Sequence, residues 1–119
     1  IGSLDTTITG SRSGFSPLML WYRLQQLGEA GLRERLARSL ANAAYLLERL
    51  QEIGVPAWRN PNAITVVLPR VAPEIQRRWQ LATAGDISHV LVLPNVGRDQ
   101  IDAFVAELAT SRKEDACKA

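Results

Sequence analysis

Chemically reactive side chains are scarce in this sequence. Its 119 residues contain one cysteine, one histidine and two lysines, Lys113 and Lys118. Cys117 cannot form an internal disulfide and is not flanked by metal-ligand residues, a pattern typical of proteins from reducing compartments. We therefore expect a cytoplasmic location, no disulfide framework and no metal site.

Long apolar runs and a large excess of one charge are also missing. No run approaches the roughly 20 apolar residues that a membrane-spanning helix needs, so we expect no membrane segment. Fourteen basic residues oppose 12 acidic ones, which leaves a formal charge of +2 and no indication of a nucleic-acid surface. With 46% apolar and 22% charged residues, the chain has the composition of one folded domain with a modest core.

Hydrophobic periodicity predicts two helices in the first half of the chain. Ser16 as N-cap and Pro17 at the first helical position begin a helix that ends at Gly28. A longer helix from Glu29 to Ile53 has apolar residues at helical spacing and ends at Gly54. Its apolar positions, which we expect to pack on a sheet, are Leu32, Leu36, Leu40, Ala43, Leu47 and Leu50.

Beyond Gly54 the apolar pattern becomes that of strands separated by turns. A hairpin, two further helices and a third strand predict an α+β fold, with a three-stranded sheet covered by helices. The segment Ser111–Ala119 is polar, and we expect it to be a frayed tail. The predicted elements are strands at Val55–Arg59 and Ile64–Leu68, a helix from Pro73 to about Ala82, a strand at His89–Leu93 and a helix from Arg98 to about Thr110.

A glycine-rich loop precedes the first helix. Gly10 and Gly14 bracket Ser11 and Arg12, and glycine lets a backbone approach a ligand closely because it has no Cβ. A hydroxyl and a guanidinium in such a loop are suitable donors to an anion. The spacing by itself is more often that of an ordinary Gly/Ser turn, which is the alternative interpretation of this loop.

Seven short motifs along the chain resemble, in order and spacing, the C-terminal part of pyridoxal-phosphate-dependent amino-acid decarboxylases. The resemblance runs from about Asp5 to about Leu108 and is strongest to the bacterial histidine decarboxylases and plant serine decarboxylases. The motifs are Thr7-Ile8-Thr9-Gly10-Ser11-Arg12, Pro17-Leu18-Met19-Leu20-Trp21-Tyr22, Ala57-Trp58-Arg59-Asn60, Ile64-Thr65-Val66-Val67-Leu68-Pro69, Trp79-Gln80-Leu81-Ala82, Gly85-Asp86-Ile87-Ser88-His89-Val90 and Gln100-Ile101-Asp102.

This resemblance implies the small C-terminal domain of a fold-type I pyridoxal enzyme. Residues 1–15 would be a loop belonging to the large domain and its cofactor region, and residues 16–53 two helices linking the large and small domains. Residues 54–110 would form the small α+β domain, followed by the tail 111–119. The related enzymes also imply a homodimer.

The resemblance assigns the loop residues Gly10, Ser11 and Arg12 to the phosphate of pyridoxal 5′-phosphate, reached from the neighbouring subunit. The alternative for Arg12 is an ion pair that braces the loop. His89 is a candidate contact for the substrate carboxylate, although a lone histidine beside apolar residues is also a common structural residue. Phe15 is a second candidate substrate contact.

Two departures from the family pattern affect the predicted substrate. Phe15 stands where the family usually has histidine, and Ala63 stands where it often has serine. Both changes make a nearby pocket less polar. The amino acid that is decarboxylated therefore stays unnamed, and a loss of activity is also consistent with these two positions.

Pyridoxal enzymes bind their cofactor as a Schiff base on a lysine, but both lysines here lie in the C-terminal tail. The chain also begins at Ile1 on a loop, so we expect a fragment whose lysine-bearing N-terminal part lies upstream. The leading hypothesis is the C-terminal portion of a decarboxylase that converts an L-amino acid to its amine and CO2. The alternative is a non-catalytic α+β interaction or regulatory module derived from such a tail.

Overall fold

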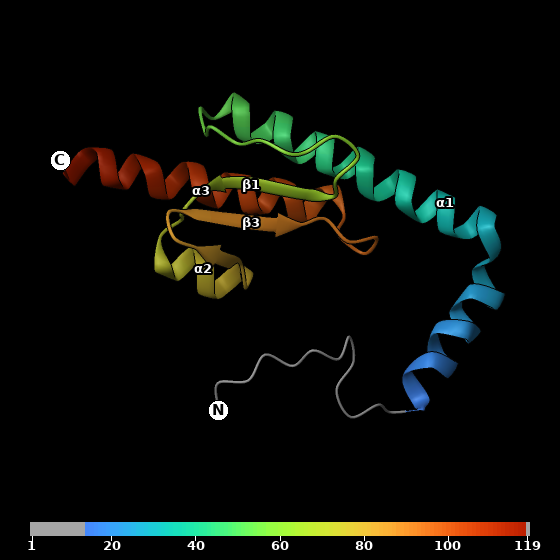
Figure 1. Cartoon of the computed structure of the whole chain (residues 1–119). Coiled ribbons are helices and arrows are strands. Elements are labelled where there is room, and N and C mark those ends of the chain that lie inside the picture. The colour runs from blue at the N-terminus through green and yellow to red at the C-terminus, as the bar shows by residue number, and fades with distance from the viewer. Residues whose placement is uncertain (1–13, 119) are drawn as a thin grey trace. The chain divides into compact units, whose positions relative to one another are not determined.

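The computed structural model describes the backbone of residues 14–118 and the side chains of residues 14–112. The loop residues Gly10, Ser11 and Arg12 lie outside this part of the chain. Two compact units, Ile1–Glu34 and Arg35–Ala119, divide the chain, and helix α1 runs from the first into the second. The elements are α1 (Phe15–Glu52), β1 (Thr65–Pro69), α2 (Pro73–Trp79), β2 (Ala82–Ala84), β3 (Ile87–Leu91) and α3 (Arg98–Lys118) (Figure 1).

Helix α1 contains the predicted interruption at Gly28. That residue has φ 60° and ψ −175°, which is not helical, so the two predicted helices are present but meet directly at a kink. Before the kink, the apolar side chains are exposed on every side of the helix. They are Phe15 (65% exposed), Leu18 (56%), Met19 (40%), Leu20 (62%), Trp21 (57%), Tyr22 (51%) and Leu24 (44%).

The buried stripe on the second half of α1 is shorter than the sequence predicted. Leu32 and Leu36 are 40% and 53% exposed, whereas Leu46, which was not among the predicted positions, is fully buried. The buried residues of α1 begin only at Ser39, so the predicted stripe is buried over its C-terminal part alone. Helical spacing identifies a face of the helix, but the length of that face in contact depends on the partner layer.

The end of α1 has the hydrogen bonds of a Schellman motif. Gly54, with φ 70°, donates its N–H to the carbonyl of Gln51 at 2.9 Å, and Val55 donates to Leu50 at 2.9 Å. A positive φ is inexpensive only for glycine, which explains the predicted stop at this position. Leu50 and Val55 are both part of the core.

The sheet is antiparallel, in the order β1-β3-β2. The predicted first strand at Val55–Arg59 is wrong as a strand, because only a single bridge joins Trp58 to Val67. The predicted strand His89–Leu93 lies two residues earlier, at Ile87–Leu91. The fold class is confirmed: three strands are covered by helices.

The helix predicted from Pro73 to about Ala82 is shorter, and strand β2 begins where it was expected to end. Helix α2 ends at Trp79, since Gln80 adopts a left-handed conformation with φ 50° and ψ 43°. Ala82–Ala84 then pairs with β3 across a two-residue turn that begins at Gly85, whose φ is 57°. Alanine and threonine carry no strong strand pattern, so pairing with β3 decides the conformation here.

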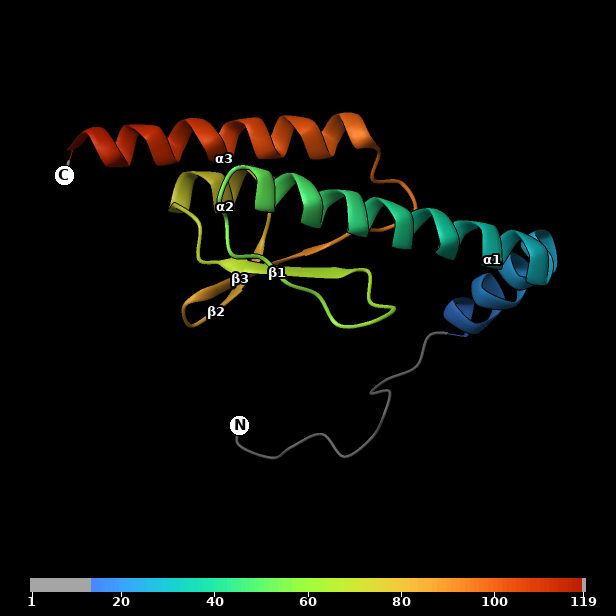
Figure 2. The same cartoon turned by 90° about the horizontal axis from the view of Figure 1, so that it is seen from above.

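The helices α2, α3 and the second half of α1 lie on one side of the sheet (Figure 2). Val66, Leu68 and Ser88 project from the sheet into this layer and are 0–1% exposed. The Ser88 hydroxyl accepts a 3.3 Å hydrogen bond from the Val71 N–H. The buried core consists of Ala43, Leu46, Leu50, Val55, Ala57, Val66, Leu68, Val71, Ile75, Val92, Ile101, Phe104, Val105 and Leu108.

Ser39 is a buried polar residue whose hydroxyl has no hydrogen-bond partner among the described residues. We expect Ser39→Ala to raise the free energy of unfolding by about 1 kcal/mol, because it removes a buried unsatisfied group and introduces a better helix former. Chemical denaturation of both chains measures the difference. Glu48→Ala, at an exposed position in the same half of α1, is the matched control. A loss of stability in Ser39→Ala would contradict this expectation.

A polar cluster joins α1 to α3. The Tyr45 hydroxyl donates a 2.8 Å hydrogen bond to Asp102 Oδ1, and Arg49 Nε donates to the same oxygen at 3.3 Å. The Arg98 guanidinium lies 4.7 Å from the centre of the Tyr45 ring, in cation–π geometry. Helix α3 continues to Lys118 rather than ending near Thr110, so the predicted frayed tail has a helical backbone as far as Lys118.

The cluster makes stability sensitive to alkaline pH. The hydrogen bond to Asp102, followed by burial and the negative charge of Asp102, raises the pKa of Tyr45 above its ordinary value of 10.0. A raised pKa favours the protonated phenol in the fold, so its stabilisation is present below the ordinary pKa and is lost as the pH rises through the folded-state value.

We expect the stability advantage of the native chain over Tyr45→Phe to shrink above about pH 10. Thermal unfolding midpoints of both chains across the alkaline range measure this difference. Tyr22→Phe is the control, because Tyr22 is 51% exposed. A constant difference between native chain and Tyr45→Phe at every pH would show that the phenol does not titrate against Asp102.

Among residues 14–118, no helix combines the length and the apolar character that crossing a bilayer requires.

Candidate functional site

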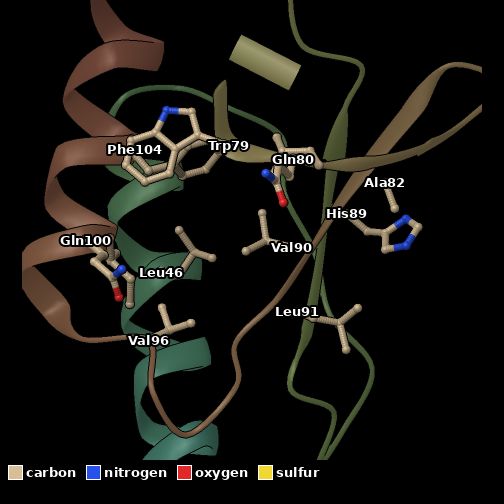
Figure 3. A pocket seen from close by; sticks show the side chains of 12 residues that line it. Leu46, Trp79, Gln80, Ala82, His89, Val90, Leu91, Val96, Gln100 and Phe104 are labelled. Atoms are coloured by element: carbon tan, nitrogen blue, oxygen red, sulfur yellow. The ribbon is translucent and has the colours of Figure 1, made fainter. Parts of the chain in front are cut away.

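The candidate site is the face of the sheet that points away from the helices. Strand pairing places Val67, His89 and Ala82 in one row across the three strands. Because facing residues of antiparallel strands project to the same side, His89 lies at the centre of this face. Figure 3 shows the His89 and Ala82 side chains on one side of β3, and Val90 on the other, toward Leu46.

Apolar side chains surround His89 on this face. Leu91 and Ile87, two residues on either side of it along β3, are 50% and 41% exposed. Trp58 is bridged to Val67, which pairs with His89, and is 52% exposed. A single imidazole in a contiguous apolar patch is typical of a surface that is covered in the complete protein.

His89 itself is half-buried, and no residue within 14–112 forms a hydrogen bond or ion pair with its side chain. Asp86, the nearest carboxylate in the sequence, lies in the turn after Gly85, and its carbonyl accepts the Arg70 N–H at 2.8 Å. The imidazole donates at least one hydrogen bond in either protonation state. The His89 imidazole could therefore donate a hydrogen bond to an anionic group that does not belong to residues 14–112.

The other predicted site residues belong to other segments of the chain. Phe15 is the first residue of α1, in the first unit, and is 65% exposed. Ala63 closes the turn after Asn60, with its N–H donated to the Asn60 carbonyl at 3.1 Å. Gly10, Ser11 and Arg12 are outside the described residues, so their assignment stays a prediction.

A pyridoxal phosphate site needs a lysine for the covalent linkage and donors for the phosphate. Residues 14–112 contain no lysine. They offer instead a half-buried imidazole in an apolar face, which suits a wall that contacts substrate while the linkage comes from other polypeptide. No group of three or more His, Cys, Asp or Glu in the described residues is arranged to hold a metal ion.

A second feature, not foreseen from the sequence, is a cavity of about 310 Å³ beside β3, whose lining includes His89, Val90 and Leu91. Trp79 and Phe104 form one wall, with ring centres 5.4 Å apart in an edge-to-face arrangement. Gln80 and Gln100 supply the amide groups of its lining (Figure 3). The left-handed backbone of Gln80 has no sequence signal, because such conformations are usually occupied by glycine or asparagine.

Comparison with known proteins identifies relatives of one activity class. The chain is 43% identical, over 95% of its length, to a histidine decarboxylase of Mesorhizobium japonicum. It is 46% identical, over its full length, to serine decarboxylase 3 of Oryza sativa subsp. japonica. The crystal structure of L-methionine decarboxylase from Streptomyces sp.590 superimposes with a TM-score of 0.72 and 38% identity over 92% of the chain.

The chain spans only part of these proteins: 30% of the histidine decarboxylase, 28% of the serine decarboxylase and 25% of the methionine decarboxylase. No family model matches it. The agreement in sequence and in fold nevertheless covers nearly every residue of the chain. In sequence and in fold, the chain is therefore a relative of the amino-acid decarboxylases that act on histidine, serine and methionine.

Proposed function

We propose that this chain is the C-terminal portion of an enzyme that uses pyridoxal 5′-phosphate to convert an L-amino acid to its amine and CO2. The observation that carries the proposal is the identity of 43–46% to a histidine and a serine decarboxylase over 95–100% of the chain. The agreement is too long to reflect a shared structural motif alone. It includes the segments around His89 and around the loop residues Ser11 and Arg12.

The bound cofactor supplies the electron sink for the charge left on Cα when CO2 departs. The chain's own residues would bind the cofactor and orient the substrate. Gly10, Ser11 and Arg12 would bind the cofactor phosphate through backbone N–H, hydroxyl and guanidinium donors, which form strong charge-assisted bonds with a dianion. His89 would donate a hydrogen bond to the substrate carboxylate, and the apolar residues around it would exclude water.

The partner that we propose for the open sheet face is the lysine-bearing polypeptide upstream in the same protein. The apolar side chains around His89, with Trp58 at 52% and Leu91 at 50% exposed, need a covering surface. The relatives carry more than two thirds of their length outside the matched part.

The first half of α1 points to the same larger assembly. A helix that is apolar on all sides is normally enclosed in a protein interior, and a single flat surface cannot cover every side of residues 15–24. We therefore propose that the upstream polypeptide and a second copy in a homodimer enclose it together. A cytoplasmic location completes the proposal, in keeping with the single cysteine.

For the substrate we propose an amino acid with a less polar side chain than histidine or serine. Phe15 and Ala63 stand where the resemblance leads one to expect histidine and serine, and both are less polar. The structural relative from Streptomyces is an L-methionine decarboxylase. Methionine is therefore the first candidate.

The test is an assay of the complete protein, the chain joined to its natural upstream polypeptide and supplied with pyridoxal phosphate. We expect amine and CO2 to form, faster from L-methionine than from L-histidine or L-serine. The variant His89→Ala should raise KM more than it lowers kcat, with His89→Gln as the conservative control. A complete protein that binds the cofactor but releases no CO2 from any of a broad panel of amino acids would support the non-catalytic module instead.

A further inference from the structure

Strand β3 extends beyond its partner on one side. It pairs with β1 along its whole length, Ile87–Leu91, but β2 pairs only with Ile87–His89. The Val92 N–H donates to the Ile64 carbonyl at 2.9 Å, on the β1 side. Because N–H groups alternate along a strand, the N–H of Leu91 points to the side where β2 has already ended. The Leu91 carbonyl accepts the Leu93 N–H at 3.1 Å.

The backbone of Gln80 creates this short gap in the sheet. If β2 continued backward, Leu81 and Gln80 would face Val90 and Leu91. Instead Gln80 is left-handed, and Leu81 donates its N–H to the Gln76 carbonyl at 3.1 Å, which closes α2. A left-handed glutamine is unusual and persists only where the surrounding structure holds it, so the gap is a built feature of the fold.

The cavity of about 310 Å³ lies beside this gap. Its walls are mainly apolar, with Trp79 and Phe104 on one side and Leu46 and Val96 below them (Figure 3). The Gln100 side chain accepts the Gly97 N–H at 3.1 Å through Oε1, which leaves its amide N–H groups free to donate. The cavity volume is at the lower limit for small-molecule sites, so the cavity can hold one large apolar side chain. Its position beside a strand edge suits a side chain from a peptide that pairs with this edge.

We propose that an extended segment of the upstream polypeptide adds one short strand to β3 at Leu91 and inserts a large apolar side chain into this cavity. This inference depends on one part of the proposed function, namely that the chain is part of a longer protein. The donor is the Leu91 N–H, and the Gln80 and Gln100 side chains line the same cavity.

A tethered segment is favoured over a separate molecule by the size of the site. A stable interface between two proteins buries about 800 Å² on each partner, far more than one strand position and one pocket provide. A segment of the same polypeptide is held nearby at an effective concentration of about millimolar, so few contacts are enough. Relatives of this chain carry more than two thirds of their length outside the matched part, which is ample to supply such a segment.

Photo-cross-linking of the complete protein tests the occupant. Gln80, exposed in the cavity lining, is replaced by the photoreactive residue benzoylphenylalanine, and cross-linked peptides are identified by mass spectrometry. We expect cross-links to one upstream segment of the same chain, containing an aromatic residue, leucine or methionine. The matched control places the same residue at Arg77, which is exposed on α2 outside the cavity. Cross-links to a second copy, or none above the Arg77 control, would overturn the proposal.

Hydrogen exchange in the same complete protein tests the added strand. Thr83, whose N–H points outward from β2, is the internal reference for a free strand edge. We expect the Leu91 amide to exchange at least about tenfold more slowly than that of Thr83. Equal exchange of the two amides would contradict strand addition. The decarboxylase assay is independent of both measurements, so an inactive protein with a filled cavity, or an active one with an empty cavity, separates the two proposals.

Discussion

Phe104→Ala is expected to lower the free energy of unfolding of the 119-residue chain by about 3–5 kcal/mol. The Phe104 side chain is 4% exposed and packs edge-to-face on Trp79 at 5.4 Å, between α3 and α2. Its removal leaves a cavity that the neighbouring helices cannot fill without moving. Denaturation in guanidinium chloride, followed by tryptophan fluorescence, measures the change.

Trp58→Ala is the matched control for that experiment. It removes a larger ring, but Trp58 is 52% exposed on the open face of the sheet, so we expect a cost of about 1 kcal/mol or less in the chain alone. Equal losses for the two variants would mean that the open face is already covered in the chain alone. In the complete protein we expect Trp58→Ala to cost more stability than in the chain alone, because the proposed partner then covers the Trp58 ring.

Arg12→Ala in the complete protein is expected to weaken binding of pyridoxal phosphate about 10- to 100-fold. A hydrogen bond to a charged group contributes about 1.5–3 kcal/mol, and each 1.4 kcal/mol corresponds to a factor of ten in affinity. The fraction of protein that keeps its cofactor through repeated desalting, measured by absorbance, reports the change. Arg12→Lys should recover part of the affinity, since it keeps the charge but not the planar fork of donors.

The competing role for Arg12 is an ion pair that braces the loop, and the two roles give different results. If Arg12 binds phosphate, the variant loses cofactor while the unfolding temperature of the cofactor-free protein stays the same. If Arg12 braces the loop, Arg12→Ala unfolds at a lower temperature, and its cofactor affinity is unchanged. Ser11→Ala, which removes a neighbouring hydroxyl donor, should follow Arg12→Ala with a smaller effect.

The helix stops at Gly28 and Gly54 were predictable because their signals are local, whereas α2 ends earlier and α3 later than predicted. Glycine at positive φ ends a helix wherever it occurs, and the stops predicted at Gly28 and Gly54 are found at φ 60° and 70°. The fold class followed from the same pattern. The core face of α1 was only partly predictable: Leu32 and Leu36 have the right spacing, but the contacts that bury this helix begin at Ser39.

The strands were predicted less accurately because a strand depends on its partner. Ala82–Ala84 has little strand propensity and is extended because it pairs with Ile87–His89. Val55–Arg59 has the composition of a strand, yet only Trp58 is bridged to β1. Pairing between segments distant in sequence outweighs local preference in both cases.

For this protein, the sequence alone determined the family resemblance, the helix stops and the absence of a lysine from residues 1–112. These depend on residue identity and on spacing along the chain. Only the tertiary structure decided that His89 lies on the uncovered face of the sheet, and that β3 keeps a free edge beside a cavity at Gln80. Both follow from strand register and from the side on which the helices pack, which residues far apart in the sequence decide together.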